Sequence, residues 1–220
     1  SSRIRLEAAM ATVSELLELA RRQIGVKECP PNSNNVRYNT WYYGREVSGA
    51  AYPWCMVFVQ WVFDQAGVKL PVRTASCGAL MRSAQSAGCW VTKGYQPGDV
   101  VIYDFPGGAA TDHCGIVESV DGTYISAIEG NTSSASDADG GAVERRARKF
   151  AQIVGAVRPT YDKEVDEVRY NTVEECPDWA RETIQKLVDK KYLDGTGKGL
   201  DLSADMVRLL VILDRAGAFK

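Results

Sequence analysis

Apolar residues recur at helical spacing near the start of the chain. The segment TVSELLELARRQI, residues 12–24, predicts an amphipathic helix. On its apolar side lie Val13, Leu16, Leu17, Ala20 and Ile24. Thr12 followed by Glu15 is typical of a capping box, and Gly25 is typical of a helix end. We therefore expect the first element of the fold to be a helix that covers a core.

Two further helices are predicted before the middle of the chain. Residues 54–66 form an apolar run that ends at Gly67, and residues 78–87 form a shorter helical segment. The stretch CPPNSNNVRYNTWYY, residues 29–43, has two prolines and several asparagines before a cluster of aromatic residues. It is expected to start as a loop.

The pattern then changes to short apolar or alternating runs separated by Gly, Pro and Asp. These runs are QPGDVVIYDF, HCGIVESVDGTYISAIEG, GAVERRARKF and IVGAVRP, and they predict strands. Asp121 and Gly122 predict a hairpin turn between two of them. Helices first and strands later indicate an α+β fold, with N-terminal helices packed on a largely antiparallel sheet.

The chain is expected to contain two domains joined by a linker. Residues 10–160 form the larger one, and the charged residues 161–169 form the linker. Residues 170–220 return to helical periodicity, with two amphipathic segments that each end at a glycine, and predict a small all-α domain. Residues 1–9 fit poorly with the first predicted helix, so we expect Met10 to be the natural start and residues 1–9 to be an expression remnant.

Composition narrows the range of partners. A formal net charge of -2 provides no basic field for nucleic acid or anionic lipid, so neither is an expected partner. No apolar run reaches the roughly 20 residues that cross a bilayer, and the first residues contain no signal peptide. Synthesis in the cytoplasm with reduced thiols is therefore expected, and a Cys77–Cys89 disulfide stays open only for a later oxidising compartment.

The spacing of the six cysteines gives no sign of a zinc site. They are Cys29, Cys55, Cys77, Cys89, Cys114 and Cys176. None forms a CxxC pair, and the chain has a single histidine. A zinc site is therefore not predicted.

Cys55 stands at the predicted start of the second helix, in PWCMVFVQWVFDQAG. The unpaired N–H groups and the partial positive charge of a helix N-terminus favour a thiolate, which is the reactive form of cysteine. The position therefore suits a nucleophile, although most cysteines that are not catalytic are simply small buried side chains.

A cysteine nucleophile needs a base, and the base needs an acceptor that orients it. His113 opens a predicted strand after a Gly-rich loop, and Glu129 and Asn131 lie near the end of the next strand. Simple pairing about the Asp121–Gly122 turn places His113 and Glu129 opposite each other, within side-chain reach. Taken singly, the histidine also fits a surface or core position, and IEGNTS also fits an ordinary turn.

Residues 10–160 resemble the CHAP domain, the cysteine- and histidine-dependent amidohydrolase/peptidase family. The matching pieces are GVKECPPNSNNVRYNTWYYG, PWCMVFVQWVFDQAG, PGDVVIYD, DHCGIVES and IEGNTS, in that order. The resemblance implies a papain-like (NlpC/P60-like) fold and hydrolysis of amide bonds in bacterial peptidoglycan. It implies Cys55 as nucleophile, His113 as base, Glu129 as the group that orients the imidazole, and Asn131 in support of Glu129.

The chain departs from the family at two places. Many CHAP domains have Gln before the nucleophile, where this chain has Trp54, so only the backbone N–H of Cys55 is identified as an oxyanion donor. Some members bind calcium through acidic residues ahead of the nucleophile, but residues 30–54 contain only Glu46. No metal requirement and no cofactor are therefore expected.

A polymeric substrate calls for an open groove. Aromatic side chains near the nucleophile are candidates to line this groove by stacking on sugar or peptide faces, and each also fits an ordinary core position. The candidates are Tyr38, Trp41, Tyr42, Tyr52 and Trp54.

Residues 170–220 weakly resemble an S-layer homology repeat, through Pro-Asp-Trp-Ala, an apolar helix, a glycine turn and a second helix. That resemblance implies cell-wall binding. The run MVRLLVIL, residues 206–213, is apolar nearly all round, which favours packing on the larger domain or on a second copy of the chain. Wall binding and formation of a homo-oligomer stay open as alternatives.

The layout is similar to endolysins of phages that infect Gram-positive bacteria, which act on the wall after release from the host cytoplasm. The leading expectation is an N-acetylmuramoyl-L-alanine amidase that works through a thioester, with peptidoglycan endopeptidase as the alternative at the same site. A cysteine protease that acts on proteins and a non-catalytic wall-binding protein are the remaining alternatives.

Overall fold

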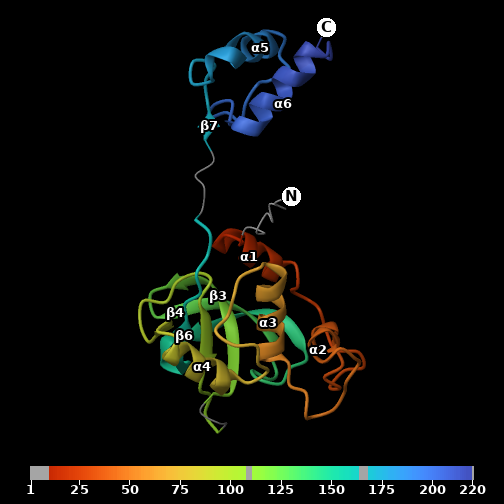
Figure 1. Cartoon of the computed structure of the whole chain (residues 1–220), viewed down its shortest axis with the longest axis vertical. Helices are drawn as coiled ribbons and strands as arrows, with labels where there is room; N and C mark the ends of the chain where they lie inside the picture. The colour runs from red at the N-terminus through yellow and green to blue at the C-terminus, as the bar shows by residue number, and fades with distance from the viewer. Residues whose placement is uncertain (1–9, 108–110, 164–167, 220) are drawn as a thin grey trace, which may run out of the picture. The chain divides into compact units, whose positions relative to one another are not determined.

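The computed structural model of the protein describes residues 10–107, 111–163 and 168–219 (Figure 1). The chain divides into two compact units, which meet in sequence at residues 164 and 165. The expectation for residues 1–9 lies outside the described residues. In the described residues, no helix is both long and apolar enough to cross a membrane.

Four helices belong to the first unit: α1 (Val13–Arg21), α2 (Arg37–Tyr43), α3 (Cys55–Gln65) and α4 (Cys77–Ser86). Three of them confirm predicted helices, with ends that differ by up to three residues. Thr12 and Glu15 form the predicted capping box, with Thr12 N donating to Glu15 Oε2 at 2.9 Å. The helix α2 was not predicted, because its aromatic sequence follows a loop and its N-cap, Val36, makes no side-chain hydrogen bond.

Six strands form one antiparallel sheet in the first unit. They are β1 (Trp90–Val91), β2 (Val100–Tyr103), β3 (His113–Asp121), β4 (Tyr124–Thr132), β5 (Ala142–Lys149) and β6 (Ile153–Val157). Their order is β1-β6-β2-β3-β4-β5, and a short 3-10 helix (Phe150–Gln152) joins β5 to β6. The predicted hairpin is present, with Asp121 paired to Tyr124 at its end. The α+β prediction is confirmed.

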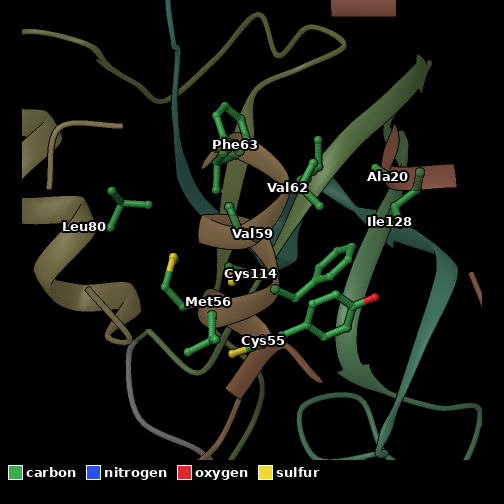
Figure 2. Packing of buried hydrophobic residues seen from close by; sticks show 14 of the residues in the cluster. Ala20, Cys55, Met56, Val59, Val62, Phe63, Leu80, Cys114 and Ile128 are labelled. Carbon is green, nitrogen blue, oxygen red and sulfur yellow. The ribbon is translucent and has the colours of Figure 1, made fainter. Parts of the chain in front are cut away.

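The main core lies between the sheet and its helices, and α3 runs through it (Figure 2). Eight of the eleven residues of α3 are buried, which explains why its sequence is apolar on nearly every side. A smaller apolar cluster, with Tyr103, Phe105 and Val117, covers the opposite face of the sheet. The sheet therefore lies between two apolar clusters, and α3 belongs to the larger one.

The second unit has its own small core. Its elements are β7 (Arg169–Tyr170), α5 (Asp178–Asp189), β8 (Leu202–Ser203) and α6 (Ala204–Arg215). Both predicted helices are present, but Arg169, expected in the linker, begins β7 and pairs with Ser203. Cys176, Ala180, Ile184, Leu202, Val207 and Val211 form the buried cluster. Other apolar residues of α6 remain exposed, including Leu209 and Ile212.

Candidate active site

Cys55 is the first residue of α3, and its side chain is buried, with 7% of its surface exposed. Trp54 precedes it without a side-chain cap, so the N–H groups of the first turn have no capping side chain. Glycine at position 130 lets β4 lie against this turn, because a Cβ there would come within 2.6 Å of Phe58 Cβ. The nucleophile predicted from sequence thus sits on a tightly packed helix end.

The surroundings of Cys55 favour its thiolate. The neighbouring thiols of Cys114 and Cys77 lower the pKa of Cys55 most, since both can donate to a thiolate. Burial opposes them, and His113 lowers the pKa further. The net direction is well below the usual pKa of a thiol, which is what a cysteine nucleophile needs.

His113 is fully buried at the first position of β3. Its Nε2 lies 3.0 Å from Glu129 Oε2, whereas its Nδ1 makes no hydrogen bond to a described residue. Since Glu129 occupies Nε2, Nδ1 is the nitrogen left to exchange a proton with Cys55. Burial alone would lower the pKa of His113, but Cys55 and Glu129 outweigh it and raise the pKa to about 9.

Glu129 is held by a second partner that sequence reasoning missed. Arg148, on β5, is 3% exposed and donates through Nε to Glu129 Oε1 at 2.9 Å. It also donates to Asp137 at 2.6 Å and lies over the Phe105 ring at 4.8 Å. Burial alone would raise the pKa of Glu129, but Arg148 and His113 outweigh it, so the pKa is lowered and the carboxylate stays charged. Nothing in the run ERRARK distinguishes Arg148 from Arg145 and Arg146, which are not buried.

The contact between His113 and Glu129 arises differently from the predicted pairing. In the observed register Ile116 faces Ile128, so Gly115 rather than His113 lies level with Glu129. The carboxylate reaches His113 diagonally by passing over Gly115, where a Cβ would lie 2.6 Å from Glu129 Cγ. The predicted register was wrong by two positions, and the absence of a side chain at Gly115 is what permits the contact.

Asn131 is also buried at the end of β4, but no hydrogen bond joins it to His113. Its Oδ1 accepts from the backbone N–H of Gly141 at 3.3 Å, and its Nδ2 has no partner among the described residues. Its backbone has a φ of 56°, in the left-handed region. This geometry places Asn131 at the irregular end of β4, where the pairing with β5 shifts between Glu129 and Thr132.

The five aromatic candidates for the groove separate into two groups. Tyr38 and Trp54 are fully buried and stacked on each other with centroids 5.6 Å apart, so both belong to the core rather than to an open groove. Trp54 also donates through Nε1 to Glu28 Oε1 at 2.8 Å. The other three, Trp41, Tyr42 and Tyr52, are partly exposed.

Two of these exposed aromatic residues lie in different surroundings. Trp41 borders a hollow formed with Phe63 and Arg73, beside the second half of α3 and away from its first residue. Tyr52 is three positions from Cys55, and its ring packs edge-on against Tyr43. Tyr52 is therefore the partly exposed candidate nearest to Cys55 along the chain.

The sequence model of one known family matches part of the first unit. Residues 47–131, which include Cys55, His113, Glu129 and Asn131, match the sequence model of the CHAP domain. No curated protein matches the sequence of the chain.

Solved structures give only distant likenesses. The chain is 20% identical to Ly7917, with a TM-score of 0.42, over 68% of this chain and 63% of that one. For the endolysin LysIME-EF1 the identity is 15% and the TM-score 0.43, over 70% and 66%. For an NLP/P60-family protein similar to lipoprotein, from Staphylococcus aureus, the identity is 17% and the TM-score 0.36, over 73% of this chain and 46% of that one. The chain thus spans less than two thirds of the length of Ly7917.

Proposed function

We propose that this chain, which carries a CHAP domain in its first unit, is a peptidoglycan hydrolase that cleaves an amide bond with Cys55 as nucleophile. The observation that carries the proposal is the buried series Cys55, His113 and Glu129 inside the segment that matches the CHAP model. A cysteine whose pKa is lowered, next to a histidine held by a carboxylate, is the arrangement of a cysteine hydrolase.

The resting site holds a thiolate on Cys55 and an imidazolium on His113. The thiolate attacks the carbonyl carbon of the scissile amide, and the backbone N–H of Cys55 donates to the oxyanion. His113 then gives its proton to the leaving amine, and a thioester on Cys55 remains. Water, deprotonated by His113, hydrolyses the thioester and restores the resting pair.

Two groups support these steps without touching the substrate. Glu129 fixes His113 through Nε2 and stabilises its charged form, and Arg148 keeps Glu129 ionised. The Trp54 indole is occupied by Glu28, so it does not serve as an oxyanion donor in place of the glutamine found in many CHAP domains.

The bond that we propose first is the amide between the lactyl group of the sugar and L-alanine, which makes the protein an amidase. An endopeptidase that cuts within the stem peptide or the cross-bridge would use the same residues. We further propose that the enzyme reaches the wall after release from the cytoplasm. The second unit would then bind the wall or join two copies of the chain.

Mass spectrometry of digested Gram-positive peptidoglycan tests the function and the nucleophile together. Wild-type protein is expected to release glycan strands freed of stem peptides. Cys55→Ala is expected to lose about a thousandfold or more of this activity, because no other group can form the thioester. Cys89→Ser, a partly buried cysteine of the same unit, is the matched control and should keep it.

Other outcomes of this experiment would favour one of the alternative functions or refute the assigned nucleophile. New amines inside the peptides would assign an endopeptidase with the same catalytic residues. Equal cleavage by the wild type and Cys55→Ala would refute Cys55 as nucleophile. Binding to walls from several genera without any cleavage would favour the non-catalytic alternative, and cleavage of casein alone would favour a protein-directed protease.

A further inference from the structure

Three cysteine sulfurs meet below the first turn of α3. Cys55 is the first residue of α3, Cys77 is the first residue of α4, and Cys114 is the second residue of β3. Their Sγ atoms all lie within 4.8 Å of one another. Figure 2 shows Cys55 at the start of α3 and Cys114 close to the same helix. Across the described part of the chain, no other three His, Cys, Asp or Glu side chains come close enough to share a metal ion.

The remaining cysteines have ordinary surroundings. Cys89 lies 3.7 Å from the carbonyl oxygen of Ala84, and Cys176 lies 3.5 Å from that of Thr172, so both thiols donate to backbone. Cys29 is exposed. The sulfurs of Cys55, Cys77 and Cys114 instead face one another, which concentrates three soft ligand atoms in one place.

The spacing of the three sulfurs suits a metal ion better than a disulfide. A zinc ion bound at about 2.3 Å from each sulfur of a tetrahedral site holds the sulfurs about 3.8 Å apart. Pairs of sulfurs within 4.8 Å need to approach by about 1 Å or less to reach that geometry. A disulfide requires the two sulfurs to come to about 2.05 Å, which is a much larger displacement.

Charge and access also favour a cation held by thiolates. Two helix N-termini, those of α3 and α4, end at the cluster, and their partial positive charges stabilise the negative sulfurs. Cys55 and Cys77 keep 7% and 6% of their surface exposed, while Cys114 is fully buried. Cys114 thus forms the floor of the cluster, and the other two form its mouth.

We propose that Cys55, Cys77 and Cys114 together bind one thiophilic divalent cation of the zinc class, with a solvent molecule as fourth ligand. Cys77 and Cys114 release their protons to solvent as the ion binds, and Cys55 binds as the thiolate that it already is in the resting site. The bound ion occupies the sulfur of Cys55 and so stops amide cleavage reversibly. This inhibition rests on the proposed function, whereas the binding itself does not.

Metal titration of the reduced full-length protein tests the site without any substrate. Zinc competed against a chromogenic chelator is expected to bind at one ion per chain. Cobalt in its place is expected to give the intense visible bands of a tetrahedral site and a thiolate-to-metal charge-transfer band. Cys77→Ser, Cys114→Ser and Cys55→Ser should each weaken zinc binding by at least about tenfold, since a lost ligand costs no less than a lost partner of a ligand. Cys89→Ser is the matched control and should bind like the wild type.

Circular dichroism of each variant shows whether it is folded. Of the three substitutions, Cys77→Ser, at the mouth of the cluster, is expected to disturb folding least. The proposal is overturned if the wild type binds no zinc, or if folded Cys77→Ser binds zinc and cobalt like the wild type.

Zinc should also inhibit cleavage of peptidoglycan, and a chelator should restore this activity. Cys77→Ser should need at least about tenfold more zinc than the wild type for half-inhibition of its own activity. A chain that binds zinc through these cysteines but cleaves no wall keeps the metal site and refutes the hydrolase. A chain that cleaves walls but binds no zinc supports the hydrolase and refutes the metal site.

Discussion

At the scale of single residues, the candidate site depends on a position with no side chain. Glu129 reaches His113 across Gly115, and the backbone there leaves no room for a Cβ. Sequence reasoning correctly brought His113 and Glu129 together, but it relied on pairing directly across the hairpin. The diagonal contact could not be predicted, because Asp121 pairs with Tyr124 instead of lying in the turn, and the register then shifts again at the bulge between Val117 and Ser119.

Gly115→Ala should therefore reduce activity, although residue 115 takes no part in the proposed chemistry. The new methyl group displaces the Glu129 carboxylate from His113, so we expect kcat to fall by about 10- to 100-fold. The overlap should also cost about 1–3 kcal/mol of unfolding free energy. Steady-state kinetics on solubilised peptidoglycan and chemical denaturation measure the two effects.

The double variant Gly115→Ala/Glu129→Gln is the control for that mechanism. If both changes act through the same contact, kcat of the double variant should be no lower than that of Glu129→Gln. Losses that multiply would mean that Gly115 acts through a different route.

The pH dependence of the proposed reaction depends on the same residues. The pKa of His113 is raised to about 9, and the pKa of Cys55 is lowered. The thiolate–imidazolium pair should thus exist at pH values above the lowered pKa of Cys55 and below about 9. As the pH rises through about 9, His113 loses the proton that the leaving amine needs, so kcat/KM should fall. A pH–rate profile checks this, and activity that keeps rising above pH 9 would contradict the assignment.

At the scale of elements, most helices and strands of the first unit could be predicted from the sequence. The capping box of Thr12 and Glu15 marked the start of α1, and Gly67 marked the end of α3, because local hydrogen bonds decide where helices begin and end. The cluster formed by Cys55, Cys77 and Cys114 and the role of Arg148 were beyond reach. Both depend on which strand and helix ends the topology brings together, and the spacing of residues along the chain does not encode that.

Glu118, at the bulge of β3, links three elements. It accepts from Arg21 on α1 at 2.7 Å and from Arg145 on β5 at 2.8 Å. Arg145 lowers the pKa of Glu118 most, burial opposes it, and with Arg21 the pKa falls to about 2. The carboxylate therefore adds stability above its unfolded pKa of about 4.5, and this contribution is lost as the pH falls toward 2.

Glu118→Gln should reduce the unfolding free energy by on the order of 1 kcal/mol at neutral pH, and the difference from wild type should vanish near pH 2. Urea denaturation over this pH range measures it. Glu18→Gln, which removes an exposed pair with Arg22 on α1, is the matched control and should change stability by less than about 0.5 kcal/mol. A constant difference at every pH would show that charge is not the cause.

At the scale of the whole molecule, each unit has a separate buried core. The core of the second unit is built from α5, α6 and the β7–β8 pair. Leu187, on α5, is also fully buried. We therefore predict that the units unfold as separate cooperative transitions. The second unit covers residues 165–220 and should account for roughly a quarter of the total unfolding enthalpy, since enthalpy scales with chain length.

Leu187→Ala tests this organisation, because the cavity costs about 2–5 kcal/mol in the unit that contains it. Scanning calorimetry should show the smaller transition at a lower temperature or lost, with the larger one unchanged. Peptidoglycan fragments already in solution should be cleaved at the wild-type rate. A single transition that shifts as a whole would contradict two independent units.

The buried row of Arg148, Glu129, His113 and Cys55 has alternating charge, positive and negative in turn, so its sum in the resting state is zero. In the proposed reaction, formation of the thioester removes the charge of Cys55, and the proton given to the amine removes that of His113. These two charges disappear together, while Arg148 and Glu129 still balance each other. The interior therefore never holds a net charge at any stable stage of the cycle, and the surrounding apolar layers can stay dry and closely packed throughout turnover.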